Sequence, residues 1–147
     1  MIRLAASRFD LAAELAAFVA PGAGAIASFT GLVRDEGGRV SALELDHHPL
    51  LTPRSLDAIE ADTRARFDLI DLIIVHRHGC VERGEPIVFV AAAAHHRRAA
   101  FDAVDYAMDR LKLDAIFWKK ERRRGGDRWI KPRADDHAAA KRWEQPA

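Results

Sequence analysis

The pattern of apolar and polar positions predicts strands and helices in mixed order along the chain. Strands are expected where apolar residues alternate with polar ones, or run together, between turn residues. The segments with that pattern are 2–6, 25–34, 40–47, 69–76, 87–94, 115–121 and 128–131. The segments with helical spacing of apolar residues are 11–20, 54–67, 97–113 and 135–144. Residues 78–84 are predicted to be a connecting turn, and the irregular order of elements indicates an α+β fold.

Capping and turn residues predict where several elements begin and how they connect. Asp10 is expected to cap the first helix, and Thr52, followed by Pro53, to cap the second. Gly37 and Gly38 predict a hairpin turn that pairs the second and third strands. The longest helix has an apolar stripe that is expected to face the core, formed by Phe101, Val104, Met108 and Leu111.

Length and composition are those of a globular protein. We expect the 147 residues to form one domain, 1–147, and 49% apolar with 31% charged residues excludes disorder. No apolar run reaches the ~18 residues of a membrane span, and charges interrupt the first ten residues, where a signal peptide needs an apolar stretch. A single cysteine, Cys80, excludes an internal disulfide and a cysteine-based zinc site. We therefore expect a cytoplasmic protein without a metal ion or other cofactor.

Positive charge is concentrated in one segment of a nearly neutral chain. The net charge is +1, but residues 110–133 contain ten basic and three acidic residues, an excess of +7. An anionic partner would explain this excess, and so would a solvated basic face. The alternative function is a nucleic-acid-binding module, which a strong salt dependence of binding would support. Acidic residues elsewhere cancel the charge and no recognised nucleic-acid motif occurs, so the sequence mildly disfavours this alternative.

Lys119 is the first candidate for chemistry. In a strand it shares one face with Phe117 and Glu121, whereas Trp118 and Lys120 lie on the other. A lysine held beside an aromatic wall and among other cations can have a lowered pKa, so its amine can act as a base or nucleophile near neutral pH. The alternative is an ordinary surface lysine whose amine reaches solvent.

Lys112 and two further segments offer sites for an anion. Lys112 ends the longest helix, where the helix dipole alone can explain a cation, yet the chain returns as the strand of Lys119 and the two amines can converge. His96 and Arg97 lie at a helix N-terminus, where backbone N–H groups favour phosphate or carboxylate. Arg34 follows a strand and precedes a glycine turn. Solvated cap and hairpin residues are the competing interpretation for the last three.

Two weaker signals have mainly structural interpretations. His76 and His78 share a strand face, as some metal ligands do, but no third ligand is evident. Cys80 has no catalytic partner nearby in the sequence, so it is expected to be a passive thiol.

A series of motifs, in order over most of the chain, resembles the catalytic (large) subunit of molybdopterin synthase, the MoaE family. The most specific is Phe-Trp-Lys-Lys-Glu at 117–121 with Leu-Lys at 111–112 upstream. The other matching segments are 29–34, 43–49, 74–79, 87–90, 96–97, 100–101, 108–112, 126–129 and 140–143. The resemblance implies an α/β hammerhead-type domain, with a mixed, mostly antiparallel sheet and flanking helices.

The resemblance also implies an activity and partners. Such enzymes are sulfurtransferases that form the dithiolene of molybdopterin on cyclic pyranopterin monophosphate (precursor Z). The sulfur arrives as a thiocarboxylate at the C-terminal Gly-Gly of a small ubiquitin-like subunit. The usual assembly is a heterotetramer with a large-subunit homodimer at its centre, and neither nucleic acid nor membrane is a partner.

Residue by residue, the resemblance implies which side chains form the site. Lys119 and Lys112 match the catalytic lysines. The substrate-binding positions are Leu32, Val33, Arg34, His96, Arg97, Lys112, Lys119, Lys120 and Glu121. Leu32 departs from the family, in which many relatives carry a lysine there, so it is expected to bind through its backbone only. The position of Cys80 needs no cysteine in relatives, which fits a sulfur supplied by the partner.

Overall fold

The computed structural model describes residues 1–144 and contains strands and helices in the mixed order that the sequence predicts. The strands are β1 (Ile2–Ala5), β2 (Ala25–Leu32), β3 (Val40–His47), β4 (Asp71–Arg77), β5 (Gly79–Glu82), β6 (Pro86–Ala94), β7 (Phe117–Arg123) and β8 (Arg128–Ile130). The helices are α1 (Leu11–Ala17), α2 (Leu51–Arg66), α3 (Arg97–Asp114) and α4 (Ala134–Lys141). None of the helices in the described part is long and apolar enough to cross a bilayer.

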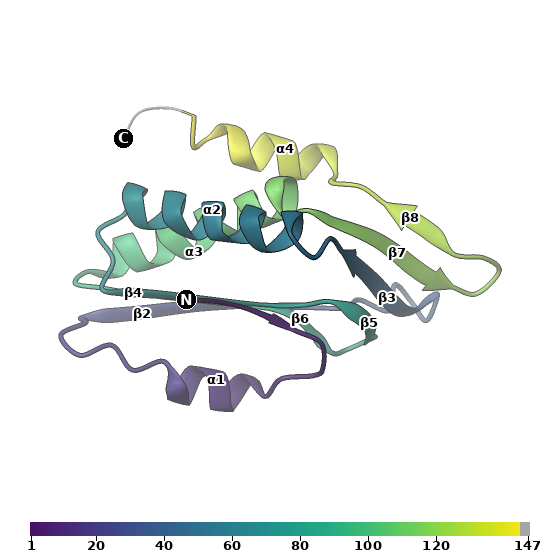
Figure 1. Ribbon diagram of the computed structural model, residues 1–147, viewed down its shortest axis with the longest axis horizontal. Helices are drawn as coiled ribbons and strands as arrows, with labels where there is room; N and C mark the ends of the chain where they lie inside the picture. Colours follow the sequence, from purple (N-terminus) through teal and green to yellow (C-terminus); the bar gives the residue numbers. More distant parts are fainter. Residues whose placement is uncertain (145–147) are drawn as a thin grey trace.

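The strands form two sheets that meet end to end (Figure 1). The first has the order β1-β4-β6-β2 and the second the order β5-β3-β7-β8. Within residues 1–144, only β1 and β4 pair in parallel, and the other pairs are antiparallel. The α+β class with mostly antiparallel pairing is therefore confirmed, although the division into two sheets was not foreseen.

The predicted hairpin between the second and third strands is wrong. Gly37 and Gly38 do form a turn with positive φ, +72° and +81°, but β2 pairs with β6, whereas β3 pairs with β5 and β7. The physical reason lies in β6, which is apolar on both faces and is buried best between two neighbouring strands, β4 and β2. The turn therefore carries the chain from one sheet to the other.

Helices cover both faces of the first sheet (Figure 1). One core cluster lies between this sheet and α2 and α3, and a second lies on the face that α1 covers. The alanines of β6, residues 91–94, are fully buried, and the small side chains of Ala92 and Ala94 let α3 pack closely over the strand. A third cluster, built on Leu45 and Val81, lies on the inner face of the second sheet, and the half-buried Phe117 packs against both the first and third clusters.

Asp10 caps α1 as predicted, but the expected role of Thr52 is wrong. Helix α2 begins one residue before Thr52, and the Nδ1 atom of His48 accepts from the backbone N–H groups of Leu50 and Leu51 at 3.2 and 3.1 Å. The Thr52 hydroxyl instead donates to the carbonyl of Ile116 at 2.5 Å. The hydroxyl therefore bonds to an acceptor that is distant in the sequence, and this bond ties α2 to the segment before β7.

Two further expectations need correction. Phe101 is 58% exposed, because the buried face of α3 is shifted toward its small residues. The buried residues of α3 are Ala100, Ala103, Val104, Tyr106, Ala107 and Leu111. The segment 78–84 is more than a turn, since it contains β5, whose single buried residue, Val81, completes the third core cluster beside β3.

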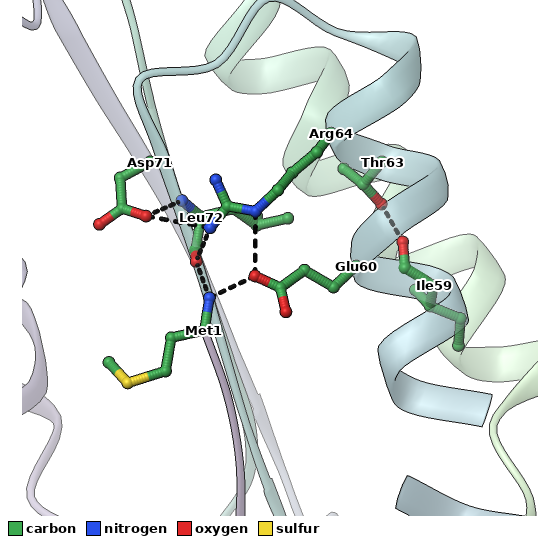
Figure 2. Close-up of polar contacts among 7 residues, drawn as sticks. All are labelled: Met1, Ile59, Glu60, Thr63, Arg64, Asp71 and Leu72. Carbon is green, nitrogen blue, oxygen red and sulfur yellow. Dashed lines mark hydrogen bonds and ion pairs between the residues drawn. The ribbon is translucent and has the colours of Figure 1, made fainter. Parts of the chain in front are cut away.

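A polar network ties α2 to the strands beneath it (Figure 2). The Met1 amino group donates to the carbonyl of Leu72 at 2.6 Å and pairs with Glu60. Arg64 donates to Glu60, Asp71 and the Leu72 carbonyl at 3.0, 3.0 and 2.9 Å. These contacts hold α2 against β1 and β4, and α2 in turn anchors the chain that enters β7.

Candidate active site

Lys119 lies on the apolar inner face of the second sheet. It is paired across the sheet with the fully buried Leu45 and with Ile130. Its side chain is half-buried, and burial lowers the pKa of Lys119 to about 8. The charge of Lys112 lowers this pKa further, and the carboxylate of Asp136 on α4 partly opposes the shift. An amine with this pKa is partly neutral near physiological pH.

Lys112 and Lys119 are held near each other by the short connection between α3 and β7. Lys112 lies exposed in the last turn of α3. Within the connection, the backbone N–H of Ile116 donates to the Ser55 hydroxyl at 3.0 Å, and the Ile116 carbonyl accepts from Thr52 at 2.5 Å. Both bonds come from α2, so this helix fixes the turn that sets the relation between the two amines. The structure thus brings the two predicted catalytic lysines together.

His76 belongs to the same cluster, which the sequence analysis missed. Its ring stacks on Phe117, with 4.3 Å between centroids and 17° between planes. Burial, the hydrogen bond to Arg77, and the charges of Lys119 and Lys112 together set the pKa of His76 at about 4. A signal was present in the sequence, since His76 ends the apolar run 69–76, and such a run is typical of a strand that is buried on both faces.

Glu121 and Lys120 have partners within the fold. Glu121 is 8% exposed and accepts from Arg123 and Arg128 at 3.0 and 3.1 Å. Lys120 lies on the outer face of the sheet, as the strand alternation predicts, and pairs with Glu44 at 2.9 Å. The carboxylate of Glu121 is therefore engaged by two guanidinium groups, although its strand position on the side of Lys119 is as expected.

Leu32 ends β2, an edge strand of the first sheet, and Val33 and Arg34 follow it. Leu32 is 50% exposed and Arg34 is exposed, whereas Val33 is buried. The backbone N–H of Val33 donates to the carbonyl of Glu85 at 3.0 Å. Among these three residues, the Arg34 guanidinium is the group open to an anion.

His96 and Arg97 lie far from the lysine pair within one chain. His96 precedes α3 and makes no side-chain capping bond, and both side chains are exposed. Arg97 begins the same helix in whose last turn Lys112 lies. At 1.5 Å per residue the two positions are about 22 Å apart. One chain therefore does not bring Arg97 to the lysines.

Neither a metal cluster nor a well-placed thiol occurs in the described part of the chain. Residues 1–144 hold no group of three or more His, Cys, Asp or Glu side chains that could bind a metal ion. Cys80 is exposed and is paired across the sheet with Glu44, which is paired in turn with Lys120. Cross-strand pairs share a face, so the thiol lies on the face opposite Lys119.

The chain matches a known protein family over most of its length. The family model for the MoaE protein matches residues 4–114, which is most of the chain. The chain belongs to the MoaE family. This confirms the resemblance that the motifs indicate, and Lys112 lies within the matched range.

Individual relatives extend the similarity beyond residues 4–114 to nearly all of this chain. The molybdopterin synthase catalytic subunit of Cereibacter sphaeroides is 47% identical over 140 residues, 94% of this chain and 96% of the relative. A solved MoaE protein from Burkholderia ambifaria has a TM-score of 0.83 at 43% identity and covers 99% of this chain and 98% of its own. A complex of subunits 1 and 2 of the molybdopterin-converting factor from Helicobacter pylori has a TM-score of 0.75 at 20% identity, covering 90% and 91%, and shows the shared fold alone.

Proposed function

We propose that this chain is the catalytic subunit of a molybdopterin synthase in the cytoplasm. It transfers sulfur from the thiocarboxylated C-terminus of a small ubiquitin-like subunit to cyclic pyranopterin monophosphate and forms the dithiolene of molybdopterin. The observation that carries the proposal is the half-buried Lys119, whose pKa is lowered to about 8, beside Lys112. Membership of the MoaE family supplies the reaction class.

The lysine pair suits a reaction between two anions. The thiocarboxylate and the substrate phosphate are both negative, so a cluster with two amines and few free carboxylates attracts both. Lys119, partly neutral at pH 7, acts as a general base or forms a transient adduct. Lys112, exposed and cationic, holds the incoming carboxylate or the developing oxyanion. The tail is left as a carboxylate after each transfer, and two loaded tails serve each product.

The distant His96 and Arg97 fit this function if the chain forms a homodimer. β2 is one of the two edge strands of the first sheet, and exposed apolar side chains lie on β2 and the neighbouring helix α3. They are Ile26, Phe29, Leu32 and Phe101. The start of β2 is tied to the end of β6, immediately before α3, because Gly24 donates to the Ala94 carbonyl at 3.0 Å. Two-fold pairing of β2 edges is antiparallel, so it carries the start of one α3 toward the far end of the other β2.

Such a dimer unites the proposed substrate-binding residues. Arg34 follows the far end of β2, so His96 and Arg97 of the partner subunit approach it there. A guanidinium and a helix N-terminus from one chain then bind the phosphate, while the lysine pair of the other chain carries out the transfer. With a small subunit at each end, the assembly is a heterotetramer.

The nucleic-acid alternative has less support. Much of the basic segment is neutralised within the fold, where Glu121 pairs with two arginines and Glu44 pairs with Lys120 and Arg122. Glu36 pairs with Arg133 and also with Arg123, one of the two arginines on Glu121. The excess of +7 is therefore a poor measure of the charge that this face presents.

The decisive experiment is reconstitution. The purified chain is mixed with precursor Z and a small subunit ending in a thiocarboxylate, and molybdopterin is measured. Product is expected with the loaded subunit and not with the same subunit ending in a plain carboxylate. Absence of product with a loaded partner that binds the chain would refute the proposal.

A further inference from the structure

Arg34 opens a loop, residues 34–39, that leads from the first sheet to the second and that we call the Arg34 loop. A backbone hydrogen bond closes its far end, where the N–H of Val40 donates to the carbonyl of Asp35 at 2.9 Å. Glu36 is half-buried, whereas the other five residues of the loop are exposed. Glu36 is therefore the residue through which the rest of the protein can hold this loop.

The backbone of Glu36 has an unusual conformation. Its φ is +49°, and within residues 1–144 every other residue with a positive φ is a glycine. A residue with a Cβ atom adopts this region at a cost in free energy, so surrounding contacts must hold it there. One such contact is on the backbone, since the Glu36 carbonyl accepts from Nε of Arg39 at 3.0 Å. The others involve the carboxylate.

The carboxylate of Glu36 binds two guanidinium groups from other elements. Its Oε2 atom lies 3.4 Å from Nη2 of Arg123, and its Oε1 atom lies 3.7 Å from Nη2 of Arg133. Arg123 ends β7, the strand of Lys119, and Arg133 immediately precedes α4. The side chains of Arg123 and Glu36 are only 16% and 22% exposed, and Arg123 also pairs with Glu121 at 3.0 Å. A partly buried network of this kind holds its members more firmly than an isolated surface pair does.

We propose that Glu36 is a positioning residue for Arg34. Its carboxylate fastens the Arg34 loop to β7 and to the start of α4, so the guanidinium that binds the substrate phosphate keeps a fixed relation to the strand of Lys119. The inference rests on the proposed function for the role of Arg34. When a binding loop is ordered in only a fraction of the molecules, its apparent affinity falls by that fraction. A loop that is ordered before the substrate arrives therefore lowers the KM without touching the reacting atoms.

The first test is a pair of matched substitutions. Glu36→Gln removes the charge but keeps the length of the side chain. It should raise the KM for precursor Z about five-fold, as for a loop ordered in about one molecule in five, and leave kcat nearly unchanged. Asp35→Asn is the control, because it removes a charge one residue nearer to Arg34. An asparagine can still accept from the N–H of Gly37, as Oδ1 of Asp35 does at 3.1 Å, so the KM should stay the same or fall.

The effect of Glu36 should pass through Arg34. In an Arg34→Ala background, Glu36→Gln should therefore add no further rise in the KM. A five-fold rise in that background, or an equal rise in Asp35→Asn, would overturn the proposal. So would an unchanged or lowered KM in Glu36→Gln, and a lowered KM is the result expected if Glu36 merely offsets the positive charge of residues 110–133.

A second measurement needs no substrate. Backbone ¹⁵N relaxation of the full chain should show the wild-type Arg34 loop to be as rigid as the flanking strands on the ps–ns timescale. Glu36→Gln should make the loop mobile, and Asp35→Asn should leave it rigid. If Glu36→Gln does not fold, Arg133→Gln takes its place, because it breaks the 3.7 Å pair from the side of an exposed guanidinium. Its effect should have the same direction and be smaller, since Arg123 remains.

The relaxation data separate this inference from the proposed function. A loop that is already mobile in the wild type, or that stays rigid in the folded variants of the Glu36 pairs, would overturn the role of Glu36. If the loop becomes mobile as expected but the wild-type chain binds no precursor Z, the result counts against the proposed function alone.

Discussion

Replacement of Lys119 is the most informative perturbation of this protein. A pKa of about 8 leaves about one amine in ten neutral at pH 7, against about one in 3,000 at the ordinary 10.5. The fold thus raises the supply of free base about 300-fold. Removing a positioned proton-transfer group costs about 10²–10⁴-fold in rate, so Lys119→Ala should lose nearly all turnover. It should remain folded and still bind the small subunit, because the change removes a partly buried charge.

Two further variants separate base chemistry from positive charge. Lys119→Arg should not restore turnover, because a guanidinium stays protonated. Lys120→Ala is the matched control, since Lys120 lies next in the strand but on the outer face, paired with Glu44. Its loss should change the rate only slightly.

The assay is single-turnover formation of molybdopterin with a loaded small subunit, measured from pH 6 to 9. The wild-type rate should rise with pH and level off above about 8, because the neutral amine is the active form and burial with Lys112 lowers its pKa. A fully active Lys119→Arg enzyme, or a rate that falls through this range, would show that only charge is needed at position 119. The base role would then be abandoned.

Three other predictions test the rest of the site. Arg97→Ala should raise the KM for precursor Z more than it lowers kcat, because a phosphate contact persists through the reaction, and an unchanged KM would remove Arg97 from the site. Cys80→Ser should leave product formation unchanged with a loaded partner, since the thiol lies on the face opposite Lys119, and lost activity would contradict a sulfur supplied by the partner. Asp136→Asn should move the rising limb of the pH–rate profile to lower pH, because this carboxylate raises the pKa of Lys119, and an unmoved limb would exclude the contact.

Local features of this protein were readable from the sequence because each depends on neighbours along the chain. Asp10 caps α1 through the backbone of Ala13, only three residues on. The turn between β7 and β8 contains Gly125 and Gly126, a pair of glycines that marks a turn in the sequence itself. Strand alternation, with a period of two residues, correctly places Lys119 and Lys120 on opposite faces. Such patterns need no knowledge of what packs against them.

Contacts between distant segments were decided by the tertiary structure. Gly37 and Gly38 formed the predicted turn, but burial of the apolar β6 directed β2 and β3 into different sheets. Thr52 had the right chemistry for a cap, yet the carbonyl of Ile116, 64 residues away, took its hydroxyl. The competing partners in these cases come from remote parts of the chain. Local conformational preferences are smaller than the free energy gained when apolar strands such as β6 are buried.

The candidate site shows the same division. Its two lysines could be named from their motifs, but the lowered pKa of Lys119 arises from burial and from the charge of Lys112 at the end of α3. The stack of His76 on Phe117 joins residues from β4 and β7, and the ion pairs of Glu121 depend on where two arginines fold back. Sequence therefore determined which groups are available, and packing of the two sheets with α3 decided which groups meet, how deeply they are buried and in which charge state they act.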